Sequence, residues 1–259
     1  MAHAAEPIER LYSEEAEVYE VFSADRDFQA QCQFLRTQFQ RAETRHVAEL
    51  FAGPAYHSSI LRRQGYSVIC MDASSKMKAL ACRGGDIDPV NYIIGTIPDD
   101  VGSTFAKICV DSVFILRYSI GLIGPDQFCS LLRSLRPRMV IGGSLILEIH
   151  SKAILHTDLN ELGIRRRSVK LNDGHKLVCI WPAGDIVVAR DGFSEMVVSL
   201  EWYLADELVR KREFLSREWI YSPDEICSLA AQSGGWVVRE IASAPRGFDQ
   251  SDVLIIEAT

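Results

Sequence analysis

The sequence lacks any long apolar run, since none of its hydrophobic stretches approaches the ~20 residues that a helix needs to span a bilayer. Its N-terminal residues are acidic, without the basic start and apolar centre of a secretory signal. These absences predict a cytoplasmic protein with no membrane partner.

Paired metal-binding and disulfide patterns are missing as well. Seven cysteines are scattered without a CxxC pair, and their odd number does not suit a disulfide framework. HxH or HxxxH spacing would place two imidazoles on one metal, and the six histidines show neither spacing. We therefore expect reduced thiols and no bound metal.

Positive charge is in short supply, because 28 Lys and Arg face 35 Asp and Glu for a net charge of −7. A field of that sign repels a phosphate backbone, so we expect no nucleic-acid partner. The remaining composition is ordinary for a globular protein, with 47% hydrophobic and 24% charged residues. A chain of 259 residues can form one substantial α/β domain with an elaboration.

The most informative stretch is 47–79, VAELFAGPAYHSSILRRQGYSVICMDASSKMKA. It predicts a strand, a tight turn at Gly53, a helix over 58–64 and a second strand over 66–71 that ends in Asp72. This order is typical of a nucleotide-binding βαβ unit. Asp72 follows Gly53 by 19 positions, close to the spacing of about 20 residues at which such folds place a carboxylate on ribose hydroxyls.

The turn contains few glycines for a dinucleotide site. Phe51 and Ala55 stand where glycine is usual, and Pro54 removes one backbone N–H. A pyrophosphate needs close backbone approach and N–H donors. A cofactor without phosphates therefore suits the turn better, and a Rossmann oxidoreductase is disfavoured.

Unbroken apolar runs separated by helices continue beyond this unit, as expected for a parallel sheet buried on both faces. We expect strands over 91–95, 105–116 and 144–149, with a helix over 126–135 and a turn over 136–143.

The last hundred residues change character. Short runs between turn signals predict antiparallel strands over 165–220. Ser222-Pro223 then begins a helix, which two closing strands follow. The N-terminal residues 5–45 have the amphipathic pattern of helices, with a break near residue 24.

The motif over 47–79 and this order of elements resemble the class I S-adenosylmethionine (SAM) methyltransferases. The resemblance implies SAM as cofactor and an α/β fold, a Rossmann-like, doubly wound, mostly parallel seven-stranded sheet with an N-terminal helical lid and a small antiparallel β insert. It divides the chain into a lid (1–45), a SAM-binding core (46–164), an insert over the acceptor pocket (165–220) and the closing helix and strands (221–259).

The resemblance also implies roles for single residues. Glu49 matches the acid that reaches the methionyl amino group, Gly53 the central glycine, and Asp72 the carboxylate on the ribose diol. Tyr19 matches a tyrosine that reaches the methionyl carboxylate; packing on the amphipathic helix face is the alternative. The implied cofactor contacts are Tyr19, Glu49, Phe51, Ala52, Gly53, Asp72, Ala73, Met77, Thr96, Ile97, Ile115 and Leu116.

The loop after 105–116 resembles motif IV, which closes over the transferring methyl. Many relatives end it with a histidine that serves as base or orienter, whereas Leu122 stands here. The polar candidates at the strand ends are Arg117, Tyr118, Glu148 and His150, of which Arg117, Tyr118 and His150 are the predicted catalytic residues. Arg117 suits an acceptor that carries a carboxylate.

We therefore expect methyl transfer to nitrogen, oxygen or carbon of a small-molecule acceptor, by a monomer or homodimer. The alternative is a protein of the same fold that binds SAM or its product S-adenosylhomocysteine (SAH) without transfer, as a cyclase or scaffold. The absent histidine and glycines favour this alternative.

Overall fold

The computed structural model describes residues 5–24, 26–41, 44–106, 108–150, 166–171, 173–188, 192–248 and 251–259. Its contacts divide the chain into two compact units. Unit 1 comprises Met1–Asp25 and Ile154–Ile220, and unit 2 comprises Arg26–Ala153 and Tyr221–Thr259. The first boundary between the units falls after Asp25, whereas the sequence predicted a boundary after residue 45.

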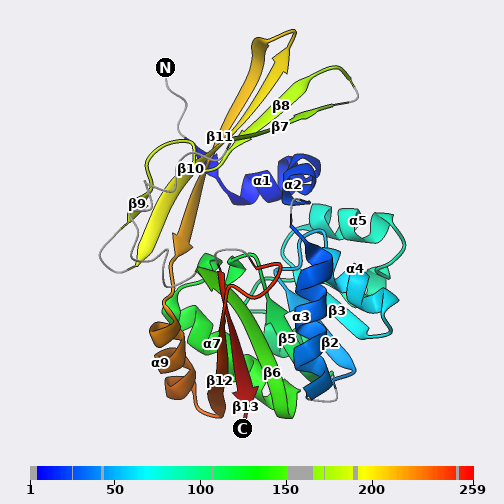
Figure 1. Cartoon of the computed structure of the whole chain (residues 1–259), viewed down its shortest axis with the longest axis vertical. Coiled ribbons are helices and arrows are strands. Elements are labelled where there is room, and N and C mark those ends of the chain that lie inside the picture. Colours follow the sequence, from blue (N-terminus) through cyan, green and yellow to red (C-terminus); the bar gives the residue numbers. More distant parts are fainter. Residues whose placement is uncertain are drawn as a thin grey trace. The chain divides into compact units, whose positions relative to one another are not determined.

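The described part of unit 2 contains a seven-stranded sheet with the order β12-β13-β6-β5-β2-β3-β4 (Figure 1). Neighbours from β4 to β6 pair in parallel, and β13 is antiparallel to both β6 and β12. This confirms the prediction of a Rossmann-like, mostly parallel sheet. The strands are β2 (His46–Leu50), β3 (Ser67–Asp72), β4 (Tyr92–Ile94), β5 (Val110–Ile115), β6 (Met139–His150), β12 (Trp236–Ser243) and β13 (Ser251–Ala258).

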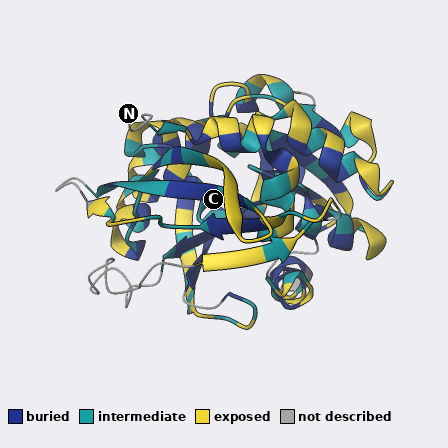
Figure 2. Ribbon diagram, turned by 90° about the horizontal axis from the view of Figure 1, so that it is seen from above, coloured by how far each residue is buried: buried dark blue, intermediate teal, exposed yellow. Residues whose placement is uncertain are grey.

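Helices of unit 2 cover this sheet with one buried side each, as the dark blue and yellow faces of single helices in Figure 2 show. In Figure 1 the strands run between α3 and α4, which pack together, and the packed pair α7 and α9. The helices are α3 (Phe28–Arg41), α4 (Tyr56–Arg63), α5 (Ser75–Arg83), α6 (Val101–Thr104), α7 (Pro125–Leu135) and α9 (Pro223–Ser233), with short 3-10 turns η1 (Pro89–Asn91), η2 (Ser119–Leu122) and η3 (Arg136–Arg138).

The core of unit 2 lies along its central strands. Val113, Phe114, Leu145 and Ile146 of β5 and β6 are fully buried, and so is Leu254 of β13. Strands covered on both faces explain the unbroken apolar runs of the sequence.

Two strand limits were predicted incorrectly. β5 begins at Val110 and not at residue 105, because α6 and the buried Phe105 precede it. β6 begins at Met139, inside the segment that its glycines predicted to be a turn. Gly143 instead serves a close approach of two strands, since a Cβ there would lie 2.7 Å from the Asp111 carbonyl oxygen.

Unit 1 contains, in its described residues, a six-stranded sheet in the order β1-β11-β10-β8-β7, with β9 beside β10. The pairs are antiparallel, which confirms the predicted insert, except that β1 pairs with β11 in parallel. The elements are β1 (Glu6–Pro7), α1 (Glu9–Glu14), α2 (Ala16–Ser23), β7 (Arg166–Lys170), β8 (Lys176–Ile180), β9 (Val187–Val188), β10 (Phe193–Leu204) and β11 (Glu207–Trp219).

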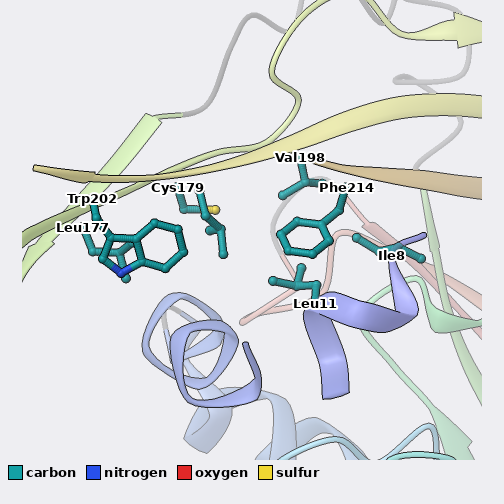
Figure 3. Packing of buried hydrophobic residues seen from close by; sticks show 8 residues of the cluster. Ile8, Leu11, Leu177, Cys179, Val198, Trp202 and Phe214 are labelled. Carbon is teal, nitrogen blue, oxygen red and sulfur yellow. The ribbon is translucent and has the colours of Figure 1, made fainter. Parts of the chain in front are cut away.

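One apolar cluster holds the N-terminal segment to this sheet. Figure 3 shows Ile8 and Leu11 beside Phe214, with Trp202 at the other end of the cluster. β1 was missed from the sequence because two residues are too few to show a strand period. Among the described residues of both units, no helix is long and apolar enough to cross a membrane.

Candidate active site

The sheet order of unit 2 changes direction between β2 and β5. The connections from β2 lead outward to β3 and β4, whereas β5 lies on the other side of β2 and leads to β6. Open α/β sheets bind ligands outside the carboxyl ends of the strands at such a switch point. The turn after β2 and the loop after β5 therefore define the candidate active site.

The turn after β2 keeps the backbone shape of a glycine-rich turn with one glycine. Phe51, Gly53 and Ala55 all have left-handed backbones, with φ of +54°, +51° and +55°. This conformation costs a residue with a Cβ roughly 1–2 kcal/mol. A Cβ added to Gly53 would have no atom within 4 Å, so open space lies beside the turn.

Asp72 fixes this turn from the end of β3. The Gly53 N–H donates to Asp72 Oδ2 at 2.9 Å, and the Ser74 N–H donates to Asp72 Oδ1 at 2.9 Å. The Tyr92 hydroxyl donates to the Gly53 carbonyl oxygen at 2.6 Å, so both polar groups of Gly53 are held. Each Asp72 oxygen keeps acceptor capacity beyond its one N–H. Burial raises the pKa of Asp72 above its ordinary value, against the opposing effect of the Ser74 and Gly53 N–H donors.

Glu49 lies buried beneath the turn and bonds to the start of α4. It accepts hydrogen bonds from the Ser58 hydroxyl at 2.5 Å and the Ser58 N–H at 3.2 Å, and its Oε1 lies 3.1 Å from His57 Nδ1. His57 Nε2 lies 2.7 Å from Gln31 Oε1, and Gln31 Nε2 donates to the Gly247 carbonyl oxygen at 2.8 Å. This buried series of hydrogen bonds joins the turn to α3.

The loop after β5 brings the three candidate catalytic residues together. Arg117 and Tyr118 are consecutive left-handed residues, both with φ of +60°. The Tyr118 ring stacks on the His150 ring, with centroids 4.0 Å apart and planes 6° apart. The Arg117 N–H donates to Glu148 Oε2 at 2.6 Å, and the Tyr118 hydroxyl lies 2.7 Å from Ser251 Oγ.

The other implied cofactor contacts are distributed as follows. The Thr96 N–H donates to Asp100 Oδ2 at 2.8 Å, so a carboxylate stands near the place where the sequence shows no acid. Tyr19 lies on α2 in unit 1, where its ring meets Tyr12 edge-on at 5.0 Å. Ala73 is exposed at the end of β3, and four further residues are buried: Met77, Ile97, Ile115 and Leu116.

Sequence reasoning missed several polar residues of the site, namely Arg26, Tyr92, Asp100 and Ser251. Each lies outside the two motifs, so only the fold brings it to the strand ends. Asp100 had the clearest signal, as an acid four positions after Thr96. In the described part of the chain, no group of three His, Cys, Asp or Glu side chains could hold a metal ion.

No protein-family model and no curated protein matches the chain. Solved structures match nearly its whole length. SAM-bound CalS10, an amino pentose methyltransferase of Micromonospora echinaspora, has 13% identity over 93% of this chain and 97% of that chain, with a TM-score of 0.73. The sugar N-methyltransferase KedS8 of a Streptoalloteichus species has 16% identity over 93% and 92%, with a TM-score of 0.74. A SAM-dependent methyltransferase of Clostridium acetobutylicum has 14% identity over 95% and 98%, with a TM-score of 0.71.

This chain has the class I methyltransferase fold. The methyltransferase fold agrees with the strand order of unit 2 and with the place of β13 between β6 and β12. At these identities the likeness concerns the fold, and the chemistry rests on the site residues.

Proposed function

We propose that the protein transfers a methyl group from SAM to a nitrogen atom of a small-molecule acceptor. One observation carries the proposal: the left-handed turn at Gly53 has open space beside it and faces a carboxylate with acceptor capacity. Two proteins of similar structure are N-methyltransferases, the sugar N-methyltransferase KedS8 and the glycopeptide N-methyltransferase MtfA.

The site residues suit an adenosine ligand without phosphates. Asp72 accepts the two ribose hydroxyls on its remaining lone pairs. The Thr96 and Asp100 pair stands at the end of β4, where it reads the adenine edge, and Met77 and Ile97 supply apolar surface. The turn offers few N–H donors to a pyrophosphate, because Pro54 has none and the Gly53 N–H already binds Asp72.

SAM supplies, when bound, a methyl group on a positively charged sulfur. The protein's part is to hold the acceptor atom in line at roughly 3 Å and to keep water away. A neutral amine attacks with its own lone pair, whereas a hydroxyl usually needs a base. An amine therefore suits a loop that has Leu122 in place of the expected histidine. Tyr118 and His150 orient the acceptor at the ends of β5 and β6.

Calorimetric titration with SAM, SAH and NADH tests the cofactor assignment. We expect SAM and SAH to bind and NADH to leave no signal. Binding of NADH alone would overturn the proposal in favour of an oxidoreductase.

Product analysis tests the transfer itself. A panel of amino sugars, each with its counterpart that carries a hydroxyl in place of the amine, is incubated with SAM and analysed by mass spectrometry. We expect the mass of one methyl group on amines only. SAM binding with no methylated product in an extended metabolite pool would instead favour a protein that binds the cofactor without transfer.

A further inference from the structure

Glu148 is a fully buried carboxylate in the apolar strand β6. A buried charge is costly unless it is paired and hydrogen-bonded. Oε1 of Glu148 accepts from the Arg26 guanidinium and from the Ser251 hydroxyl at 2.8 Å, and Oε2 accepts from the Arg117 N–H. In this ion pair with the Arg26 guanidinium, the Glu148 carboxylate accepts hydrogen bonds and donates none.

The direction of the hydrogen bonds follows from this carboxylate. Ser251 has one hydroxyl proton, which it donates to Glu148. In the 2.7 Å contact between Ser251 Oγ and the Tyr118 hydroxyl, Tyr118 is then the donor. The hydrogen bonds run from Tyr118 through Ser251 to Glu148, so the phenolic proton points inward. The lone pairs of the Tyr118 oxygen take no part in this series of hydrogen bonds.

The same residues hold the Tyr118 ring in place. Glu148 binds the Arg117 N–H and so secures two successive left-handed residues. The ring stacks on His150, and the Arg26 guanidinium lies 5.1 Å from the ring centroid. Because β5 pairs in parallel with β2, Tyr118 and Gly53 both follow strands at the same edge of the sheet.

We propose that Arg26, Glu148 and Ser251 are positioning residues that turn the Tyr118 proton inward and present its oxygen lone pairs to the sulfonium of the methyl donor and to the positive charge that develops on the amine during transfer. This inference rests on the proposed function. An outward phenolic proton would repel a sulfonium or ammonium group, whereas an outward lone pair attracts it. Orientation of one hydroxyl thereby tunes the site for a cationic ligand.

Ser251→Ala tests the proposed orientation of Tyr118 without an identified acceptor. It removes the hydroxyl that links Tyr118 to Glu148 and changes no charge. The probes are SAM, with a sulfonium; sinefungin, with an ammonium-bearing carbon at that place; and SAH, with a neutral sulfur. We expect the preference for SAM and for sinefungin over SAH, measured as ratios of Kd by calorimetry, to fall about three- to tenfold in Ser251→Ala. Affinity for SAH itself should change less than about twofold, since its sulfur carries no charge.

Ser112→Ala is the matched control. Ser112 is also a fully buried serine of the same sheet, and its hydroxyl contacts Ser144 Oγ and donates to the Ser144 carbonyl oxygen at 2.9 Å. We expect this control to keep the wild-type ratios. Tyr118→Phe removes the oxygen and should lower the ratios, and adding Ser251→Ala to it should have no further effect.

Three results would overturn the inference. Ratios in Ser251→Ala that equal those of Ser112→Ala would show that Ser251 does not orient Tyr118. Additive effects in the double variant would show that Ser251 acts independently of Tyr118; in both cases the proposed methyl transfer stands. Wild-type protein that binds neither SAM nor SAH would remove the proposed function, and the inference with it.

Discussion

Residues of the site hydrogen-bond to one another, and Asp72 is the clearest case. Its two oxygens each accept one backbone N–H, from Gly53 and from Ser74. The carboxylate therefore shapes the turn and also serves as the proposed ribose acceptor.

Asp72→Ala should weaken SAH binding by about 1–3 kcal/mol, the scale for removing a hydrogen-bond partner from a bound polar group. Calorimetry measures the affinity directly. Asp88→Ala is the control, because Asp88 is an exposed aspartate whose side chain accepts a local N–H, from Val90. Equal affinity of wild type and Asp72→Ala would place the ribose elsewhere.

The raised pKa of Asp72 predicts a pH dependence for the same interaction. Ribose hydroxyls donate to the ionised carboxylate, so protonation of Asp72 weakens binding. Because burial raises the pKa of Asp72, this loss begins at a higher pH than an ordinary aspartate would give. SAH affinity measured from neutral to acidic pH should fall in wild type, whereas Asp72→Asn should show a flat, weaker profile over the same range.

The residues of the cofactor turn could be predicted because they are close in sequence. Gly53 and Asp72 belong to one βαβ unit with a known spacing. Arg26 and Ser251 could not, since they reach Glu148 from 122 and 103 positions away and neither lies in a recognisable motif. Local patterns identify a turn, whereas a hydrogen-bond chain that joins β6, β13 and the loop after β5 depends on the finished fold.

Among the elements, the turn after β2 combines a required backbone shape with unsuitable residues. Ala55 is fully buried and left-handed, whereas Ala52, three positions earlier in the turn, does not have a positive φ.

Ala55→Gly should therefore stabilise the protein by up to about 1 kcal/mol, because glycine adopts this backbone without strain. Ala52→Gly should instead destabilise it by about 0.5–1 kcal/mol, the cost of added backbone freedom in the unfolded chain. Denaturant unfolding of both variants and of wild type measures the two changes in the free energy of unfolding. The same sign of change in both would show that strain at residue 55 is not stored in the turn.

Arg212 of β11 holds the N-terminal segment that comprises β1, α1 and the residue after α1. Its guanidinium pairs with Glu6, Glu14 and Glu15 at 2.7–2.8 Å and has a side-chain exposure of 13%. The hydrogen bond from Arg212 lowers the pKa of Glu6, and hydrogen bonds from Arg10 and Arg212 lower that of Glu14.

Arg212→Met should lower the melting temperature of unit 1 at neutral pH. A carboxyl whose pKa is lowered by folding stabilises the protein at pH values above its pKa in the unfolded state. This stabilisation is lost as the pH falls through its pKa in the folded state. The difference between variant and wild type should therefore narrow in acid, which thermal unfolding at several pH values measures. Arg217→Met, which breaks an exposed pair with Glu195, should cost only about 0–1 kcal/mol at any pH. A difference that persists in acid would point to lost packing of the arginine stem.

Elements with a long apolar run or a strong cap were predictable, and those that depend on distant partners were not. Ser222 begins α9 with a reciprocal pair of hydrogen bonds to Glu225, as its sequence position indicates. β1 exists only because it pairs with β11, and the first residues of β6 are a strand only because Gly143 lets two backbones meet.

For the molecule as a whole, two sheets with separate cores predict two unfolding transitions. SAH binds residues of unit 2 in the proposed function, so it should raise one transition and leave the other unchanged. At a concentration 100 times its Kd, the added stability is about 2.7 kcal/mol. Differential scanning calorimetry with and without SAH checks this, and Arg212→Met should lower the transition that SAH does not move. A single transition that shifts as one would show that the units unfold together.

Unit 1 is assembled from both halves of the polypeptide, and this affects when it can fold during translation. Arg212 and Glu6 are 206 positions apart, so the N-terminal segment emerges long before its docking surface has been translated. During that interval Ile8 and Leu11 lack the strands on which they pack, whereas β2 to β5 of the other sheet have already been translated. Residues 6–15 are thus translated early and reach their final packing late.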